Sequence, residues 1–164
     1  MLFHDELCQT ASVEVAVPSE HAFAFLADPA LQGEWTLGAW ERRDLGDGLS
    51  SGTSLISGVE AYVRTEPHPE HLLVDYWVGS SPERLRRYIS ARVVPGEAIG
   101  RDPETCVVTL STWRSAARET WLASAELHHV EVRMIKARLE ARSSVPGRAQ
   151  GSSSTASMRP EPPR

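Results

Sequence analysis

The chain has 164 residues, of which 41% are hydrophobic and 24% are charged, and its formal net charge is −5. A chain of this length can bury a core of its own as one domain, without disulfides or a structural metal. Its two cysteines, Cys8 and Cys106, lack the spacing of a metal or redox motif. The acidic balance is a poor match for a phosphate backbone, so no nucleic-acid partner is expected.

Membrane insertion and secretion are also disfavoured by the sequence. No stretch approaches the ~20 apolar residues that a helix needs to cross a bilayer. The first residues include His4, Asp5 and Glu6 where a signal peptide would have a basic region and an apolar core. We therefore expect a cytoplasmic protein without a membrane span.

The first predicted elements are a strand and two short helices. Residues 10–17 alternate valine and alanine with smaller or polar residues, which is typical of a half-buried strand. Ser19 is the expected N-cap of a helix over residues 20–27, which ends before an Asp-Pro pair. A further helical turn is expected over residues 30–35.

Strand-like segments then follow at short intervals. The expected strands are residues 40–45, 53–57, 59–65, 72–78, 85–94 and 105–113. Glycines at residues 46–48 and prolines at residues 66–69 mark two of the turns between them. Short connections favour antiparallel pairing of neighbouring strands.

One long helix is expected from Ser115 to about Arg142. Steps of four and three residues place one apolar stripe along it: Trp121, Ala125, His128, Val132, Ile135 and Leu139. The order of elements predicts an α+β protein, a curved antiparallel sheet of about seven strands wrapped around the long C-terminal helix, with two short helices after the first strand.

The composition changes after this helix. Residues 143–164 are rich in Ser, Pro, Gly and Arg and almost devoid of large apolar side chains. Such a segment cannot bury enough surface to offset its ordering entropy. We expect one domain over residues 1–142 and a disordered tail over residues 143–164.

Four segments resemble a known superfamily in their order and spacing. They are VEVAVPSEHAFAFLADPALQGEW, GDGLSSGTSL, EPHPEHLLVDYWVG and ELHHVEVRMIKARLEA. Together they are similar to the START-like, Bet v 1-like helix-grip superfamily, and within it to bacterial polyketide cyclase/dehydrase-type (SRPBCC) proteins. The resemblance covers about residues 8–142. It implies a cavity between sheet and long helix that accepts a small hydrophobic, polyketide- or lipid-like molecule, without a cofactor.

His128 is the first candidate catalytic residue. It lies in the middle of the apolar stripe, where burial would tune the pKa of an imidazole able to transfer a proton. The alternative is a buried histidine bonded to a sheet carbonyl or to water.

Asp75 is the second candidate. It alternates with Tyr76 along one expected strand, so one of these two polar groups enters the cavity wall. A carboxylate there could act as a general base. The alternative, which we favour, is pairing on the outer face of the sheet with an arginine: Arg64, Arg87 or Arg92.

Aromatic side chains are candidates for the cavity wall because they stack on flat ligands. The candidate ligand-binding residues are Trp35, Tyr62, Tyr76, Trp77, Tyr88, Trp113, Trp121 and Val132. Packing in the core is the alternative for most of them. The His128/Glu131 spacing also occurs in carboxylate metal helices, but matching ligands on other helices are lacking, so no metal is expected.

Three functions remain open. The first two are a cofactor-free enzyme catalysing cyclisation, dehydration or isomerisation, and a non-catalytic carrier or sensor of the same kind of molecule. The third is a protein-interaction module with its cavity filled by side chains. A cavity of roughly 300 Å³ or more favours the first two.

Overall fold

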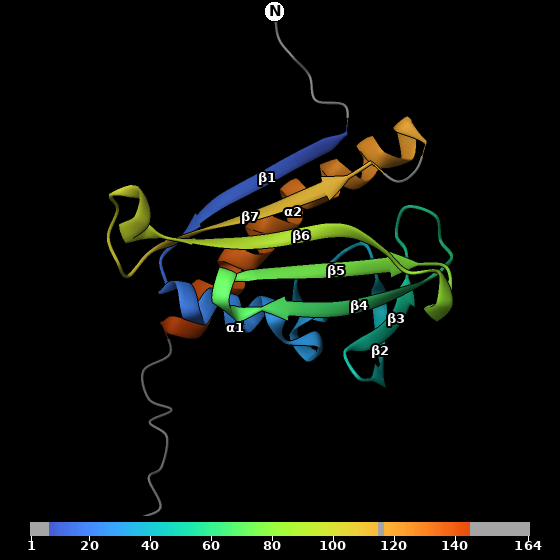
Figure 1. Ribbon diagram of the computed structural model, residues 1–164, viewed down its shortest axis with the longest axis horizontal. Helices are drawn as coiled ribbons and strands as arrows, with labels where there is room; N and C mark the ends of the chain where they lie inside the picture. The colour runs from blue at the N-terminus through green and yellow to red at the C-terminus, as the bar shows by residue number, and fades with distance from the viewer. Residues whose placement is uncertain (1–6, 115–116, 145–164) are drawn as a thin grey trace, which may run out of the picture.

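The computed structural model describes residues 7–114 and 117–144 (Figure 1). The strands are β1 (Cys8–Val15), β2 (Trp40–Gly46), β3 (Leu49–Thr53), β4 (Glu60–His68), β5 (Leu73–Gly79), β6 (Arg86–Pro95) and β7 (Cys106–Trp113). The α-helices are α1 (Ser19–Ala27) and α2 (Arg118–Ser143). Short 3-10 helices are η1 (Pro29–Glu34), η2 (Pro69–His71), η3 (Pro82–Arg84) and η4 (Gly96–Ile99).

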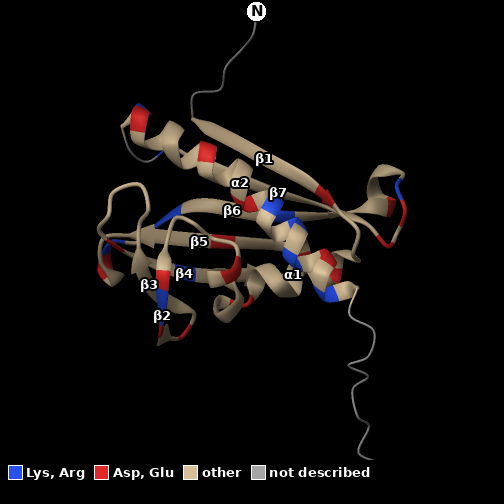
Figure 2. Cartoon of the chain, turned by 180° about the vertical axis from the view of Figure 1, so that it is seen from behind, with Lys and Arg blue, Asp and Glu red and all other residues tan. Residues whose placement is uncertain are grey.

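The strands form one seven-stranded sheet in the order β1-β7-β6-β5-β4-β3-β2. Every neighbouring pair is antiparallel. Strands β2 and β3 run steeply to β5 and β6, so the sheet curls, and both α-helices lie on one of its faces (Figure 1). Seen from that side, α2 crosses in front of the sheet (Figure 2). The predicted α+β helix-grip architecture is confirmed.

The long helix buries the stripe that its spacing predicts. All six stripe residues are buried, from Ile135 at 0% exposed to His128 at 5%. The helix packs on β1 and β7 and also contacts α1 and η1. Burying a large apolar side chain contributes about 1.5–3 kcal/mol, so this face fixes the helix across the sheet.

Three local expectations are corrected by the backbone. The expected strand over residues 53–57 is wrong, because the tight turn at Gly46, Asp47 and Gly48, all with positive φ, starts β3 at Leu49. Residues 54–59 instead form a turn, in which the Gly58 amide donates to the Ser54 carbonyl at 2.7 Å.

The other two corrections concern element ends. Ser19 is the first residue of α1 rather than its cap, and the residue before it, Pro18, has no side chain able to cap. Strand β4 continues through Pro67, where a turn was expected, and ends at His68.

The predicted tail lies outside the described residues, apart from Ser143 and Ser144. Within residues 7–114 and 117–144, no helix is both long and apolar enough to cross a membrane.

Candidate functional site

A cavity of about 120 Å³ lies between the concave face of the sheet, α2 and the segment around η1. Its wall is mostly apolar and includes Trp35, Ala39, Ala61, Val63, Val78 and Leu127. An apolar cavity of about 150 Å³ can hold benzene, whereas pockets for drug-sized ligands start at about 300 Å³. The cavity therefore falls below the roughly 300 Å³ that we expected for an enzyme or a carrier, and it matches only one ring or a group of similar bulk.

The turn between β3 and β4 forms part of the wall on the solvent side. Ser54 and Ile56 line the cavity, and Ile56 is also 37% exposed. Two further apolar side chains of this turn are exposed, Leu55 at 52% and Val59 at 61%. The turn between β3 and β4 thus contributes to the cavity wall and also presents apolar side chains to solvent.

His128 and Glu131 meet on the cavity side of α2. Their spacing of three residues puts both on one face of the helix, and His128 Nε2 lies 3.5 Å from Glu131 Oε2. His128 Nδ1 hydrogen-bonds with the hydroxyl of Thr112 on β7. The imidazole is therefore oriented from both sides, as in sites where a second group fixes the tautomer of a histidine.

The other carboxylate oxygen of Glu131 holds the segment that follows η1. Oε1 accepts from the amides of Leu37 at 2.6 Å and Gly38 at 3.2 Å, and from the hydroxyl of Thr36 at 3.3 Å. One buried side chain thus anchors the segment between η1 and β2 to the long helix.

Burial shifts the pKa of both groups toward the neutral form. It lowers the pKa of His128 to about 4, with the nearby His129 acting in the same direction. It raises the pKa of Glu131, against the three hydrogen bonds that favour the carboxylate. A neutral imidazole at physiological pH can both accept and return a proton, which general acid–base catalysis requires.

Among residues 7–114 and 117–144, Arg42 is the one basic side chain, besides His128, that lines the cavity. It is part-buried and hydrogen-bonds through Nη2 to the hydroxyl of Ser50. Burial lowers the pKa of Arg42 to about 10, which still leaves the guanidinium charged at neutral pH.

Three of the predicted aromatic residues also line the cavity, namely Trp35, Tyr76 and Tyr88. The Tyr76 hydroxyl donates to the Leu26 carbonyl at 2.8 Å, and its ring meets that of Trp35 edge-on at 5.8 Å. Burial raises the pKa of Tyr76 and of Tyr88. Tyr76 is thereby a fixed part of the wall, and Tyr88 is the freer phenol.

The remaining five predicted ligand-binding residues lie elsewhere. Trp121 and Val132 are buried but do not line the cavity. Tyr62 alternates with Ala61 and Val63, which line the cavity, so its side chain projects from the opposite face. Trp77 and Trp113 do not line the cavity, and Trp113 is 42% exposed.

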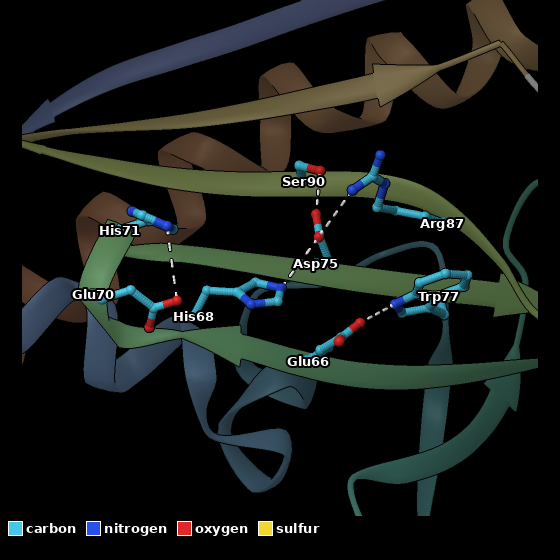
Figure 3. Close-up of polar contacts among 8 residues, drawn as sticks. All are labelled: Glu66, His68, Glu70, His71, Asp75, Trp77, Arg87 and Ser90. Atoms are coloured by element: carbon cyan, nitrogen blue, oxygen red, sulfur yellow. Dashed lines mark hydrogen bonds and ion pairs between the residues drawn. The ribbon is translucent and has the colours of Figure 1, made fainter.

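Asp75 lies on the convex face of the sheet, away from the helices (Figure 3). Its carboxylate accepts from Ser90 Oγ at 2.5 Å and lies 3.4 Å from Arg87 Nη1 and 3.3 Å from His68 Nε2. The alternation of β5 turns Tyr76 inward and Asp75 outward. This corrects the placement of Asp75 in the cavity wall and confirms the favoured pairing with an arginine.

The same convex face brings together three groups of metal-ligating type. One ligand atom each from Glu66, His68 and Asp75 lies within 4.8 Å of the other two. However, the guanidinium of Arg87 already neutralises Asp75, and Trp77 Nε1 donates to Glu66 Oε2 at 2.5 Å. A cation would have to displace Arg87, so we interpret these residues as an ion-pair network (Figure 3). The expectation of no metal stays a prediction.

Sequence reasoning missed two polar groups of the cavity. In the sequence, Glu131 drew notice only as a possible metal ligand. Its position three residues after His128 already predicts that the two side chains lie side by side on the helix. Arg42 had no signal in the sequence, because the register shift between Trp40 and Arg43 decides which way its side chain points.

No protein-family model and no curated protein matches the sequence. Solved structures do match, and one is the Zhui aromatase/cyclase from Streptomyces sp. R1128, with a TM-score of 0.63 and 16% identity over 85% of this chain and 97% of that chain. A START superfamily protein from Mycobacterium smegmatis has a TM-score of 0.59 and 13% identity, over 83% and 99%.

A plant enzyme shares the architecture. Norcoclaurine synthase from Thalictrum flavum, in complex with a transition state analogue, has a TM-score of 0.52 and 16% identity over 80% of this chain and 95% of that chain. At these identities the similarity concerns the fold, which is the START-like, Bet v 1-like fold that the four sequence segments resemble.

Proposed function

We propose that this protein binds a small, mostly apolar molecule of about one ring in the cavity between the sheet and α2. The observation that carries the proposal is an apolar cavity of about 120 Å³ whose wall includes the oriented pair His128 and Glu131. Its fold is shared with an aromatase/cyclase and with norcoclaurine synthase, both enzymes that act on organic molecules. A fold alone does not fix a function, so the chemistry of the cavity decides.

The chemistry that the cavity supports is proton transfer without a cofactor. His128 can accept a proton from a carbon next to a ligand carbonyl, while Glu131 stabilises the imidazolium that forms. The same proton can return to a departing hydroxyl group, which leaves as water. Cyclisation followed by dehydration fits this sequence and requires no oxidant or reductant.

A carrier or sensor is the second candidate, and one observation favours it. Every polar atom of Glu131 already has a partner inside the protein, and three of its bonds fasten the segment after η1. A residue with that structural task need not take part in chemistry. The cytoplasmic location inferred from the sequence stays a prediction.

Native mass spectrometry of the full chain purified from its own host tests the proposal. A stoichiometric small molecule of about one ring supports it, and turnover of that molecule by the wild type but not by His128→Gln identifies an enzyme. Binding without turnover in both proteins identifies a carrier. An empty protein that also fails to take up small ring compounds contradicts the proposal and leaves the interaction module.

A further inference from the structure

A β-bulge turns Arg42 into the cavity. The register between β2 and β3 shifts between Trp40 and Arg43, so Glu41 and Arg42 together face the single residue Gly52. Glu41 has a φ of 53°, in the left-handed region that non-glycine residues seldom adopt. Bulges of this kind re-aim a side chain, often beside a functional site. Arg42 is accordingly part-buried, whereas its neighbours in β2 are exposed.

The chain is built to accept this bulge. A Cβ atom on Gly52 would lie 2.6 Å from the Trp40 carbonyl oxygen, which is too close for any other residue to fit unchanged. The inward position of Arg42 therefore depends on a glycine in the facing strand and on a strained residue beside it.

Arg42 has no counter-charge within the described part of the chain. No carboxylate there forms an ion pair with it, its one hydrogen bond goes to Ser50, and its Nε is buried without a partner. The next residue, Arg43, is exposed and forms an ion pair with Glu60. A partly buried charge without a partner is costly unless something else neutralises it.

A second donor without a partner belongs to the same cavity wall. Trp35 is 4% exposed, and its Nε1 is buried without a hydrogen-bond acceptor among the residues that the structure describes. Leaving a buried donor unsatisfied costs about 1–3 kcal/mol. Glu131 is the one acidic residue that the described part of the chain places in the cavity wall. It cannot serve either donor, because its oxygens are held by the segment after η1 and by His128.

We propose that the ligand carries a carboxylate, which binds to Arg42 and Trp35 while the ring of the ligand occupies the apolar part of the cavity. The planar guanidinium matches a carboxylate through two parallel hydrogen bonds. The ligand class is thus a compact cyclic carboxylic acid. This inference rests on the proposed ligand-binding function and adds the identity of the polar group.

Two probes of equal shape test the charge requirement. Benzoate and benzamide are titrated into the full chain, with isothermal calorimetry as the readout. We expect benzoate to bind at least about ten-fold more tightly than benzamide, since a hydrogen bond to a charged group contributes about 1.5–3 kcal/mol. In Arg42→Gln the ratio falls to about one while the affinity for benzamide is kept.

Three more variants keep the test sharp. Arg43→Gln, one residue along the strand, leaves the ratio of benzoate to benzamide affinity unchanged. Arg42→Lys keeps part of this preference, because an ammonium supplies a positive charge but not the two parallel hydrogen bonds of a guanidinium. Trp35→Phe keeps the ring, removes Nε1–H and lowers the ratio. Thermal unfolding shows whether each variant is folded. If Arg42→Gln does not fold, the affinity ratios of Arg42→Lys and Trp35→Phe test the carboxylate instead.

The outcomes separate the two proposals. Equal affinity of the wild type for both probes overturns the carboxylate and leaves a cavity for neutral rings. A preference for benzoate that survives in both Arg42→Gln and Arg42→Lys also overturns it. If neither probe binds, the carboxylate is overturned, and a titration of toluene, a neutral ring, shows whether the proposed binding function fails as well.

Discussion

His128 and Glu131 face each other one helical turn apart, with Nε2 of the imidazole 3.5 Å from Oε2 of the carboxylate. Both side chains are buried, at 5% and 2% exposed. The histidine reaches β7 through Thr112, and the glutamate reaches the segment after η1 through Leu37 and Gly38. The pair therefore joins the helix, the sheet and the entrance of β2 around one cavity.

The depressed pKa of His128 makes stability depend on pH. The imidazole titrates near 6.5 in the unfolded chain and at about 4 in the folded one. The unfolded state thus binds the extra proton first, so this contribution is complete above pH 6.5 and is lost as the pH falls toward 4. Its size is on the order of 3 kcal/mol.

Urea denaturation between pH 4.5 and pH 7.5 measures this effect. We expect the free energy of unfolding of the wild type to fall more steeply with acidification than that of His128→Gln. Glu131 is present in both proteins, so the difference between the two curves reports the imidazole. Parallel curves would show that His128 titrates normally in the folded state.

Removing the Glu131 carboxylate should loosen the segment after η1. Glu131→Ala leaves the Leu37 and Gly38 amides without an acceptor, and we expect a loss of about 2–3 kcal/mol of stability. Hydrogen exchange at these two amides should accelerate more than exchange in β6 or β7.

Glu126→Ala is the matched control on the same helix, since Glu126 is exposed. Its effect on stability should stay within about 0.5 kcal/mol. Equal effects of the two substitutions would mean that Glu131 does not anchor the segment.

Asp75 should matter for stability and not for the ligand. Asp75→Asn weakens the contacts with Arg87 and His68 on the convex face, and we expect a cost of about 1–3 kcal/mol because the side chain is buried. The affinity of the folded variant for a ring compound should stay within about two-fold of the wild type. A folded variant that has lost ligand affinity or turnover would contradict this prediction and show that Asp75 contributes to the functional site.

Two glycine-to-alanine substitutions test whether the bulge in β2 sets the position of Arg42. Gly52→Ala forces a Cβ atom against the Trp40 carbonyl, so it should lower stability by more than about 1 kcal/mol and weaken benzoate binding. Gly38→Ala is the control for stability, because a Cβ there meets nothing within 4 Å and φ is not in the left-handed region. Gly38 lines the cavity, so this control is not used for benzoate binding. Equal tolerance of both substitutions would argue that the bulge does not set the position of Arg42.

The helix and the strand order could be predicted because they depend on local periodicity. The apolar stripe from Trp121 to Leu139 and the short turns between strands each follow from neighbouring residues. Strand β3 was misplaced, since residues 53–57 look extended in isolation and only the turn at residues 46–48 fixes the true start.

The site was harder to predict because it depends on contacts between distant segments. Alternation in β5 showed that Asp75 and Tyr76 point to opposite faces, but only packing against α1 decides which one faces inward. The position of Arg42 depends on a bulge, which adds one residue to a strand without a distinctive sequence signal.

The most direct test of the ligand site is to compare toluene binding by the wild type and by a variant whose cavity is filled by a larger side chain. Toluene is titrated into ¹⁵N-labelled wild type, Ala61→Leu and, as a control, Ala123→Leu, whose residue is exposed on α2. Ala61 lines the cavity, so a leucine there should occupy the space of the ligand. We expect saturable shifts of the amides around the cavity in the wild type and the control, and none in Ala61→Leu. No saturable shift in the wild type, or equal binding by folded Ala61→Leu, would contradict a ligand site between the sheet and α2.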